Sequence, residues 1–285
     1  MLHKLLKGKE IAEPILDEVA ERVTKLKRKG WTPHLASLEV GVNPAAALYI
    51  RNQKRICDRV GVEFENRKFD REITQQELLA AIQAMNVDPR VTGIILQRPV
   101  PRQLDLNDLQ TAIHPSKDVE GMNPTNIGKV VYGEFALGPC TSLASVEILR
   151  STGVELRGLD VVIVGHSEIV GKPIALYLVE ELATITVCHH GTRHLPQFTR
   201  RADALFVAVG RPGLITGDMV KPGAIVIDIG INQIEVDDGQ GGKKKKTVGD
   251  VDFDSVHEVA DKITPVPGGG HINTVISSRQ GFVLT

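Results

Sequence analysis

The sequence has little net charge, few cysteines and no long apolar run. Its 285 residues include 34 Lys and Arg against 35 Asp and Glu, and this balance argues against a protein that binds nucleic acid by bulk electrostatics. The cysteines, Cys57, Cys140 and Cys188, are odd in number and far apart, so we expect neither a disulfide framework nor a metal site. No apolar run approaches the roughly 20 residues of a membrane helix, and the first seven residues are too charged for a secretory signal. We therefore expect a cytoplasmic globular protein with no membrane or nucleic-acid partner.

Helical and strand-like segments alternate along the chain. Apolar residues recur at helical spacing from Ile11 to Leu26, and Thr74 with Glu77 predicts a helix that starts with a capping box. Strands are predicted at residues 35–40, 62–68, 91–97, 161–164, 185–188, 204–209 and 224–229. This alternation is typical of mostly parallel α/β sheets, and its restart after Pro139 predicts two α/β domains with a boundary near 140–150.

One stretch, residues 239–246 (G-Q-G-G-K-K-K-K), has low complexity. It could be a basic docking patch or a solvated loop between two short strands. Four lysines beside a run of glycines define no geometry, so we expect the loop.

The turn after the strand at 161–164 has the pattern G-x-S-x-x-x-G, from Gly165 to Gly171. It approximates the Rossmann fingerprint G-x-G-x-x-G, although such a turn is also common in α/β proteins without a nucleotide. The first glycine permits a tight turn, and the next helix offers free N–H groups to a pyrophosphate. The following strand leads into His189, His190 and Arg193 without an acidic residue, which favours NADP over NAD unless this is simply a polar loop.

Several segments together resemble one enzyme family, the methylenetetrahydrofolate dehydrogenase/cyclohydrolases. The matching segments are residues 40–55, 97–101, 117–128, 139–141, 164–171, 221–232, 248–251 and 263–269. The resemblance implies an α/β fold of two domains with a cleft between them. Residues 1–145, with 273–285 returning to them, would form the N-terminal substrate domain, and 146–272 the C-terminal Rossmann-type domain for NADP, or alternatively NAD. It also implies a tetrahydrofolate derivative as substrate and a homodimer.

The family oxidises the methylene bridge of the folate to a methenyl cation and then hydrolyses that cation. Tyr49 matches the tyrosine that stacks on the pterin, and Gln53 stands where the family has its catalytic lysine. Lys54 is no obvious substitute, because it lies about 140° around the helix from Tyr49. Since glutamine cannot exchange a proton near neutral pH, we expect weak or absent cyclohydrolase activity.

Other departures from the family pattern lie among the implied site residues. Arg98 replaces an apolar residue, and Glu120 replaces an aspartate that holds the pterin. His166 and His190 replace an arginine and a serine that normally face a 2′-phosphate, which weakens the preference for NADP. The implied catalytic residues are Tyr49, Gln53, Gln97 and Glu120. The implied substrate-binding residues are Arg98, Pro99, Cys140, Pro267, Gly268, Gly269, Gly270 and His271. The implied cofactor-binding residues are Thr141, Gly165, His166, Ser167, Val170, His190, Gly210, Ile231 and Thr274.

The end of the chain also departs from the family, which continues with V-G-P-M-T and a long helix. Here His271 follows the glycines, and residues 275–285 could form only a short helix. Three hypotheses remain: a dehydrogenase with impaired cyclohydrolase activity, a paralogue retuned to another folate or small molecule, and a silent folate- or nucleotide-binding protein. Retention of Tyr49 and Gln97 favours an enzyme.

Overall fold

The computed structural model describes residues 4–134, 136–237 and 242–269. These residues form two compact units. The N-terminal unit contains the described part of Glu13–Cys140, and the C-terminal unit contains the described parts of Met1–Ala12 and Thr141–Asn273. Within the described ranges, no helix is both long and apolar enough to cross a membrane.

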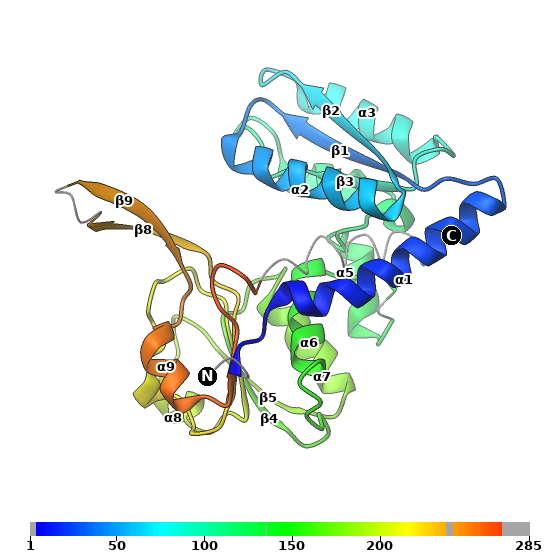
Figure 1. Cartoon of the computed structure of the whole chain (residues 1–285). Coiled ribbons are helices and arrows are strands. Elements are labelled where there is room, and N and C mark those ends of the chain that lie inside the picture. Colours follow the sequence, from blue (N-terminus) through cyan, green and yellow to red (C-terminus); the bar gives the residue numbers. More distant parts are fainter. Residues whose placement is uncertain (1–3, 135, 238–241, 270–285) are drawn as a thin grey trace. The chain divides into compact units, whose positions relative to one another are not determined.

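The N-terminal unit is built on a three-stranded parallel sheet with the order β2-β1-β3. Its strands are β1 (His34–Val40), β2 (Glu63–Phe69) and β3 (Gly93–Leu96). Helices α2 (Pro44–Val60) and α3 (Gln75–Val87) cover opposite faces of this sheet (Figure 1). The unit also contains α4 (Leu106–Ala112), a 3-10 helix (Pro115–Lys117), α5 (Pro124–Val131) and most of α1 (Gly8–Arg28).

Apolar packing and helix caps account for these elements. Leu38 of β1 and Ile94 of β3 pack with Leu78 and Ile82 of α3 in a buried cluster. The predicted capping box of α3 is confirmed, because Thr74 Oγ1 accepts from the backbone of Glu77 and the Glu77 carboxylate accepts from the backbone N–H of Thr74.

The C-terminal unit contains a five-stranded parallel sheet with the order β10-β7-β6-β4-β5. Its strands are β4 (Asp160–Val164), β5 (Thr184–Cys188), β6 (Ala204–Val207), β7 (Ile225–Asp228) and β10 (Lys262–Ile263). Its helices are α6 (Cys140–Arg150), α7 (Gly171–Glu180), α8 (Pro196–Thr199), a 3-10 helix (Gly217–Met219) and α9 (Phe253–Val259). The chain passes from β4 outward to β5 and returns to β6 on the other side of β4. Ligands of open α/β sheets bind at such a reversal, next to the carboxyl ends of the strands.

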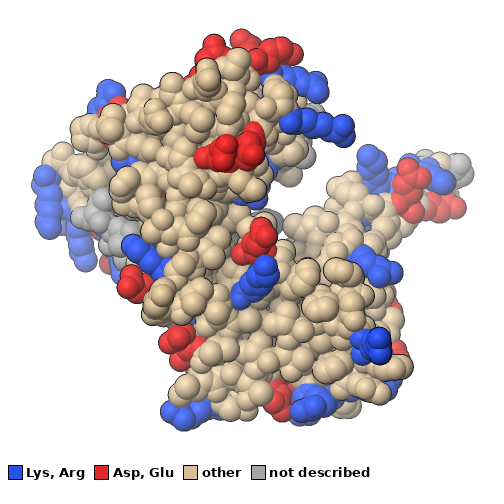
Figure 2. All heavy atoms as spheres, turned by 180° about the vertical axis from the view of Figure 1, so that it is seen from behind, with Lys and Arg blue, Asp and Glu red and all other residues tan. Residues whose placement is uncertain are grey.

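An antiparallel hairpin of β8 (Asn232–Asp237) and β9 (Lys243–Val248) extends away from this sheet (Figure 1). The prediction of a loop over 239–246 is therefore wrong for residues 243–246, which form a strand. Lys243 and Lys245 pair with Asp237 and Glu235 across the hairpin, and opposite charges at paired positions stabilise a sheet. Figure 2 shows basic and acidic side chains side by side on the projecting hairpin.

The segment before α1 packs on the C-terminal unit. Leu5 pairs with Ile263 of β10, the Leu6 N–H donates to the Ile263 carbonyl at 2.9 Å, and the Gly8 N–H donates to the Gly268 carbonyl at 3.0 Å. The family resemblance placed residues 1–145 in the first domain. Residues 4–12 instead group with the C-terminal unit, so α1 begins in one unit and continues into the other.

Candidate active site

A buried cluster of three polar side chains lies in the N-terminal unit, at the position predicted for folate chemistry. Gln53 on α2 is 0 % exposed, and its Oε1 accepts a hydrogen bond from Gln97 Nε2 at 2.8 Å. Gln97 follows β3, and its Nε2 also donates to Ser37 Oγ of β1 at 2.9 Å. The predicted residues Gln53 and Gln97 therefore meet, and Ser37 joins them. Ser37 was not among the predicted site residues, although a serine inside an apolar strand run is a visible signal.

The amide NH2 group of Gln53 has two N–H donors that are unused. Its Nε2 is buried and has no hydrogen-bond partner in the described structure, so a bound molecule could accept from it. Lys54 does not join this cluster. Its side chain is 59 % exposed, and its Nζ lies 2.9 Å from Asp58 Oδ2. Tyr49 lies one helical turn before Gln53 on α2 and is partly exposed.

Two charged residues of the predicted site lie close after β3 and after the 3-10 helix Pro115–Lys117, namely Arg98 and Glu120. The Arg98 guanidinium donates to Gln110 Oε1 on α4, and the Arg98–Pro99 peptide bond is cis. Burial, together with the negative charge of Asp118, raises the pKa of Glu120 to about 7, while the positive charge of Arg98 acts in the opposite direction. Glu120 is therefore partly protonated at neutral pH, unlike an ordinary surface glutamate.

The turn that carries Glu120 is closely packed. Gly121 has φ +66°, and a Cβ atom there would lie 2.0 Å from the carbonyl carbon of Gly138. The Cys140 N–H donates to the Glu120 carbonyl at 3.4 Å, and the Cys140 thiol donates to the Val119 carbonyl at 3.2 Å. Cys140 is buried, and these bonds give it a structural role at the edge of the predicted site.

The C-terminal unit contains a cavity of about 470 Å³ at the carboxyl ends of β4, β5 and β6. Gly165 and Ser167 line it from the turn after β4, and Ala208 lines it from the end of β6. Gly165 has φ +125°, and a Cβ atom there would lie 2.3 Å from the Ala208 carbonyl oxygen. A Cβ atom on Gly171 would lie 2.0 Å from the Gly165 carbonyl oxygen, so both glycines allow the turn and the start of α7 to pack closely. This is the geometry that brings a helix N-terminus to a dinucleotide phosphate.

Three histidines meet in this cavity. The ring centroids are 5.1 Å apart for His166 and His189, and each lies 5.8 Å from that of His190. All three line the cavity. His166 and His190 were predicted as cofactor-binding residues, and His189 was predicted only as part of the His and Arg cluster that favours NADP.

Two buried aspartates hold the loops beside the cavity. Asp250 Oδ2 accepts from the N–H groups of Val209 at 2.6 Å and Gly210 at 2.9 Å, and its Oδ1 accepts from Asn232 Nδ2. Asp228, at the end of β7, accepts from the backbone N–H groups of residues 230, 250 and 251. Gly210, a predicted cofactor residue, is therefore positioned by Asp250. Neither aspartate was among the predicted site residues.

The remaining predicted residues have different surroundings. Thr141 lies in the first turn of α6, where the neighbouring Ser142 Oγ donates to the carbonyls of Ile169 at 2.8 Å and Val170 at 3.0 Å. Ile231 is 74 % exposed, before the β8–β9 hairpin. Pro267, Gly268 and Gly269 follow β10 in the C-terminal unit, and Gly270, His271 and Thr274 lie outside the described residues, as does the predicted final helix.

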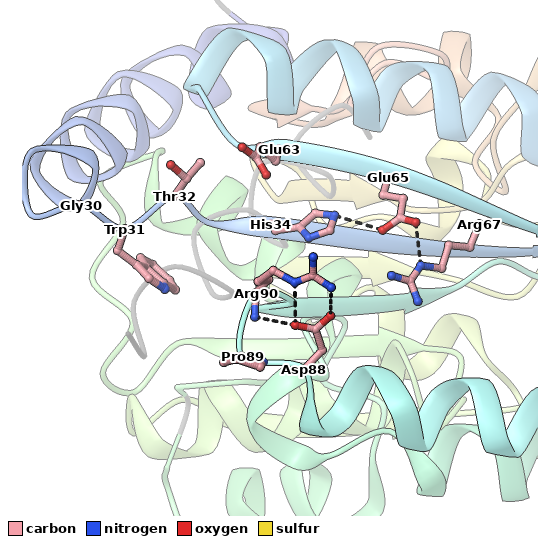
Figure 3. Close-up of a pocket in the computed structure, with 10 residues that line it drawn as sticks. All are labelled: Gly30, Trp31, Thr32, His34, Glu63, Glu65, Arg67, Asp88, Pro89 and Arg90. Atoms are coloured by element: carbon pink, nitrogen blue, oxygen red, sulfur yellow. Dashed lines mark hydrogen bonds and ion pairs between the residues drawn. The ribbon is translucent and has the colours of Figure 1, made fainter.

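A second cavity, of about 670 Å³, lies in the N-terminal unit at the amino ends of the strands (Figure 3). Most of its charged groups pair with one another. Glu65 lies 3.3 Å from His34 Nε2 and 2.7 Å from Arg67 Nε, and Asp88 lies 2.7 Å from Arg90. The hydrogen bond from Arg67 lowers the pKa of Glu65. We assign no ligand to this cavity, because most of its charges are already paired and it lies at the opposite end of the sheet from Gln97.

The fold, the buried polar cluster of the N-terminal unit and the cavity of the C-terminal unit define a class: an enzyme with an N-terminal catalytic α/β domain and a C-terminal domain that binds NAD(P). Two family models match the chain, the tetrahydrofolate dehydrogenase/cyclohydrolase catalytic domain over residues 6–120 and the NAD(P)-binding domain of the same family over residues 139–277. The chain belongs to this family, whose activities are methylenetetrahydrofolate dehydrogenase and cyclohydrolase.

Individual relatives agree with this assignment over almost the whole length. The bifunctional protein FolD 2 of Mesorhizobium japonicum is 54 % identical over 281 residues, which are 98 % of this chain and 90 % of the relative. The crystal structure of the bifunctional FolD enzyme of Campylobacter jejuni has 38 % identity and a TM-score of 0.92, with 98 % of this chain and 97 % of that chain covered. The Trypanosoma brucei enzyme, whose structure contains NADP and an inhibitor, has 32 % identity and a TM-score of 0.89, with coverage of 98 % and 96 %.

Proposed function

We propose that this protein oxidises methylene-tetrahydrofolate to methenyl-tetrahydrofolate and has weak or no cyclohydrolase activity. The observation that carries the proposal is the buried Gln53, which occupies the position of the family's lysine and is hydrogen-bonded to Gln97. In the oxidation, the methylene carbon gives a hydride to the nicotinamide ring and the folate becomes a methenyl cation. This step needs alignment of the two carbons rather than a proton acceptor.

Hydrolysis of the methenyl cation has an additional requirement. Water adds to the cationic carbon, a proton must leave that water, and the ring opens to the formyl derivative. An amide cannot accept this proton near neutral pH. Glu120 titrates in the required range, but the hydrogen bonds among described residues do not connect it to Gln53. The Gln53 Nε2 donor can orient the folate or a water molecule without taking up a proton.

The test follows the two products of one reaction mixture. With methylene-tetrahydrofolate and NADP, we expect one methenyl-tetrahydrofolate to accumulate for each reduced cofactor. Gln53→Lys should raise methenyl hydrolysis at least about tenfold, because a general base typically contributes 10²–10⁴-fold. The matched control is Lys54→Gln, which should leave both rates unchanged because Lys54 is exposed and paired with Asp58. Hydrolysis by the unmodified protein far above the spontaneous rate contradicts the proposal.

NADP is the proposed cofactor. Support comes from the absence of an acidic residue among the residues that line the cavity, because an acid at the end of β5 would hold the ribose hydroxyl of NAD. The Trypanosoma brucei relative was crystallised with NADP. The comparison of kcat/KM for NADP and NAD tests this choice, and a higher value for NAD would reverse it.

A second candidate function is the same type of oxidation on a different substrate. Arg98 and Glu120 favour it, since they place a cation and a carboxyl group of raised pKa where the family pattern has an apolar residue and an aspartate. No reduction of NADP or NAD with methylene-tetrahydrofolate would favour this second candidate over the first.

The proposed assembly is a homodimer. The β8–β9 hairpin supports it, because one face carries the partly exposed Ile234 and Val236, and a two-stranded hairpin is marginally stable on its own. Light scattering should give the mass of two chains. Val236→Glu should lower that mass to one chain, and a single-chain mass for the unmodified protein would disprove the dimer.

A further inference from the structure

Three histidine rings lie at the position where a dinucleotide-binding sheet recognises the ribose of the adenosine. The side chain after the second strand contacts the 2′ position of this ribose; a carboxylate accepts from the hydroxyl of NAD, whereas a cation accommodates the 2′-phosphate of NADP. Here the second strand is β5, and His189 and His190 follow it directly. His166 faces them from the turn after β4, with centroid distances of 5.1 and 5.8 Å.

We infer that His166, His189 and His190 together bind the 2′-phosphate of NADP and make the preference for NADP over NAD increase as the pH falls from 8.5 to 6.5. The inference rests on the NAD(P)-dependent function proposed above, and it adds to that function a cofactor specificity that depends on pH. A site that uses arginine alone would hold a constant charge over this range, whereas histidine changes its charge there.

His189 has a different role from the other two rings. The Gly191 N–H donates to His189 Nδ1 at 3.1 Å, and the His189 N–H donates to Thr192 Oγ1 at 2.9 Å. Because Nδ1 accepts a hydrogen bond, the ring proton is on Nε2, where it can be donated to a phosphate oxygen at any pH in the range. His166 and His190 are exposed, and in the proposed site they supply the part of the affinity that changes with pH.

The other charged groups nearby do not cancel this effect. Arg211 lines the same cavity from the loop after β6 and stays charged throughout, so some affinity for the 2′-phosphate remains at pH 8.5. Glu168 lies in the turn after β4, and Arg193 and His194 lie in the loop after β5, but none of them lines the cavity. Cys188 is buried at the end of β5, and burial raises the pKa of its thiol, which therefore stays neutral.

Binding and protonation are therefore linked. A phosphate dianion beside an imidazole favours the protonated ring, so binding of the 2′-phosphate should draw protons from solution. Two simple probes isolate this effect, because 2′,5′-ADP carries the 2′-phosphate and 5′-AMP lacks it. The lower pH limit is 6.5 because a phosphate monoester has its second pKa near 6 and is still mostly a dianion there.

The experiment is isothermal titration calorimetry of the full-length protein with each probe at pH 6.5 and 8.5, in two buffers of different ionisation enthalpy. From pH 8.5 to 6.5, we expect the affinity for 2′,5′-ADP to rise at least about fivefold and that for 5′-AMP to change less than about twofold. The pair of buffers should show proton uptake with 2′,5′-ADP and little with 5′-AMP.

Variants separate a charge effect from a structural one. His166→Gln with His190→Gln should abolish both the rise in affinity and the proton uptake, while His166→Arg should bind 2′,5′-ADP tightly at both pH values. The matched control is His257→Gln, because His257 stacks on Phe253 of α9 and does not line the cavity. Circular dichroism checks that each variant is folded.

The same pH dependence for both probes, or a rise in affinity that persists in the double variant, would overturn this inference but not the proposed function. If neither probe binds at either pH, the proposed NAD(P)-dependent function fails together with it.

Discussion

The ionisation of Glu120 should control how tightly the substrate binds. Burial raises its pKa to about 7, and only the ionised carboxylate can accept two N–H donors from a pterin, the role that the family resemblance implies. The ionised fraction falls about tenfold between pH 8 and pH 6 for such a group. We expect KM for methylene-tetrahydrofolate to rise by about the same factor as the pH falls, measured from initial rates of cofactor reduction.

Glu120→Gln provides the control for this pH profile. The amide does not ionise, so KM in the variant should be high at every pH and should lose most of the slope. An unchanged slope in Glu120→Gln would assign the titration to another group.

The residues that form the site differ in how far the sequence could predict them. Gln53 and Gln97 were assigned through motifs, and their contact follows from the parallel sheet that brings α2 and the end of β3 together. Ser37 was missed because its role depends on two side chains that are distant in sequence. Asp228 and Asp250 were missed for the same reason, since their partners are backbone N–H groups of several separate loops.

At the scale of elements, the junction between β4 and α7 depends on Gly171. A Cβ atom there would lie 2.0 Å from the Gly165 carbonyl oxygen, so Gly171→Ala must displace the start of α7 from the turn after β4, where we propose that the cofactor phosphate binds. We expect at least about tenfold weaker NADP binding and a loss of about 1–3 kcal/mol in the free energy of unfolding, as for other overpacked sites. Fluorescence titration with NADPH and urea unfolding measure these two effects.

Gly128→Ala is the matched control for Gly171→Ala. Gly128 lies in α5, and a Cβ atom there would have no neighbour within 4 Å. The substitution should leave NADP binding unchanged and stabilise the protein by up to about 1 kcal/mol, because alanine has the higher helix propensity. Equal effects of the two substitutions would show that close packing at Gly171 is unimportant.

The carboxyl end of β7 gives a prediction about pH and stability. Burial raises the pKa of Asp228 to about 6, from 3.8 in the unfolded chain. Between these values the folded protein binds more protons than the unfolded chain, so the Asp228 contribution is complete below pH 3.8 and is lost as the pH rises through 6. Its complete loss should cost about 3 kcal/mol of unfolding free energy, of which about 2 kcal/mol falls between pH 4.5 and 7. Urea unfolding at pH 4.5 and 7 measures this change in unfolding free energy, and Asp228→Asn should lack it. An equal change in the unmodified protein and in Asp228→Asn would contradict the assignment.

The elements show where local sequence is sufficient and where it fails. β1 was predicted because six of its seven residues are buried, which produces a continuous apolar run apart from Ser37 and Glu39. β9 was not predicted, because a run of lysines has low strand propensity. It becomes a strand through its pairing with the acidic β8, and such pairing is not encoded locally.

At the scale of the whole chain, residues 4–12 belong to the C-terminal unit, which is formed mostly by the second half of the sequence. Leu5 pairs with Ile263 and packs against the buried cluster of the C-terminal sheet, while Lys4 Nζ donates to the Ala260 carbonyl at 3.0 Å, just after α9. Leu5→Ala should therefore destabilise the C-terminal unit by about 1–2 kcal/mol, because it removes a partly buried leucine side chain. Hydrogen exchange should become faster at β7 and β10 and stay unchanged at β1 and β3. Faster exchange confined to the N-terminal unit would show that these first residues stabilise that unit instead.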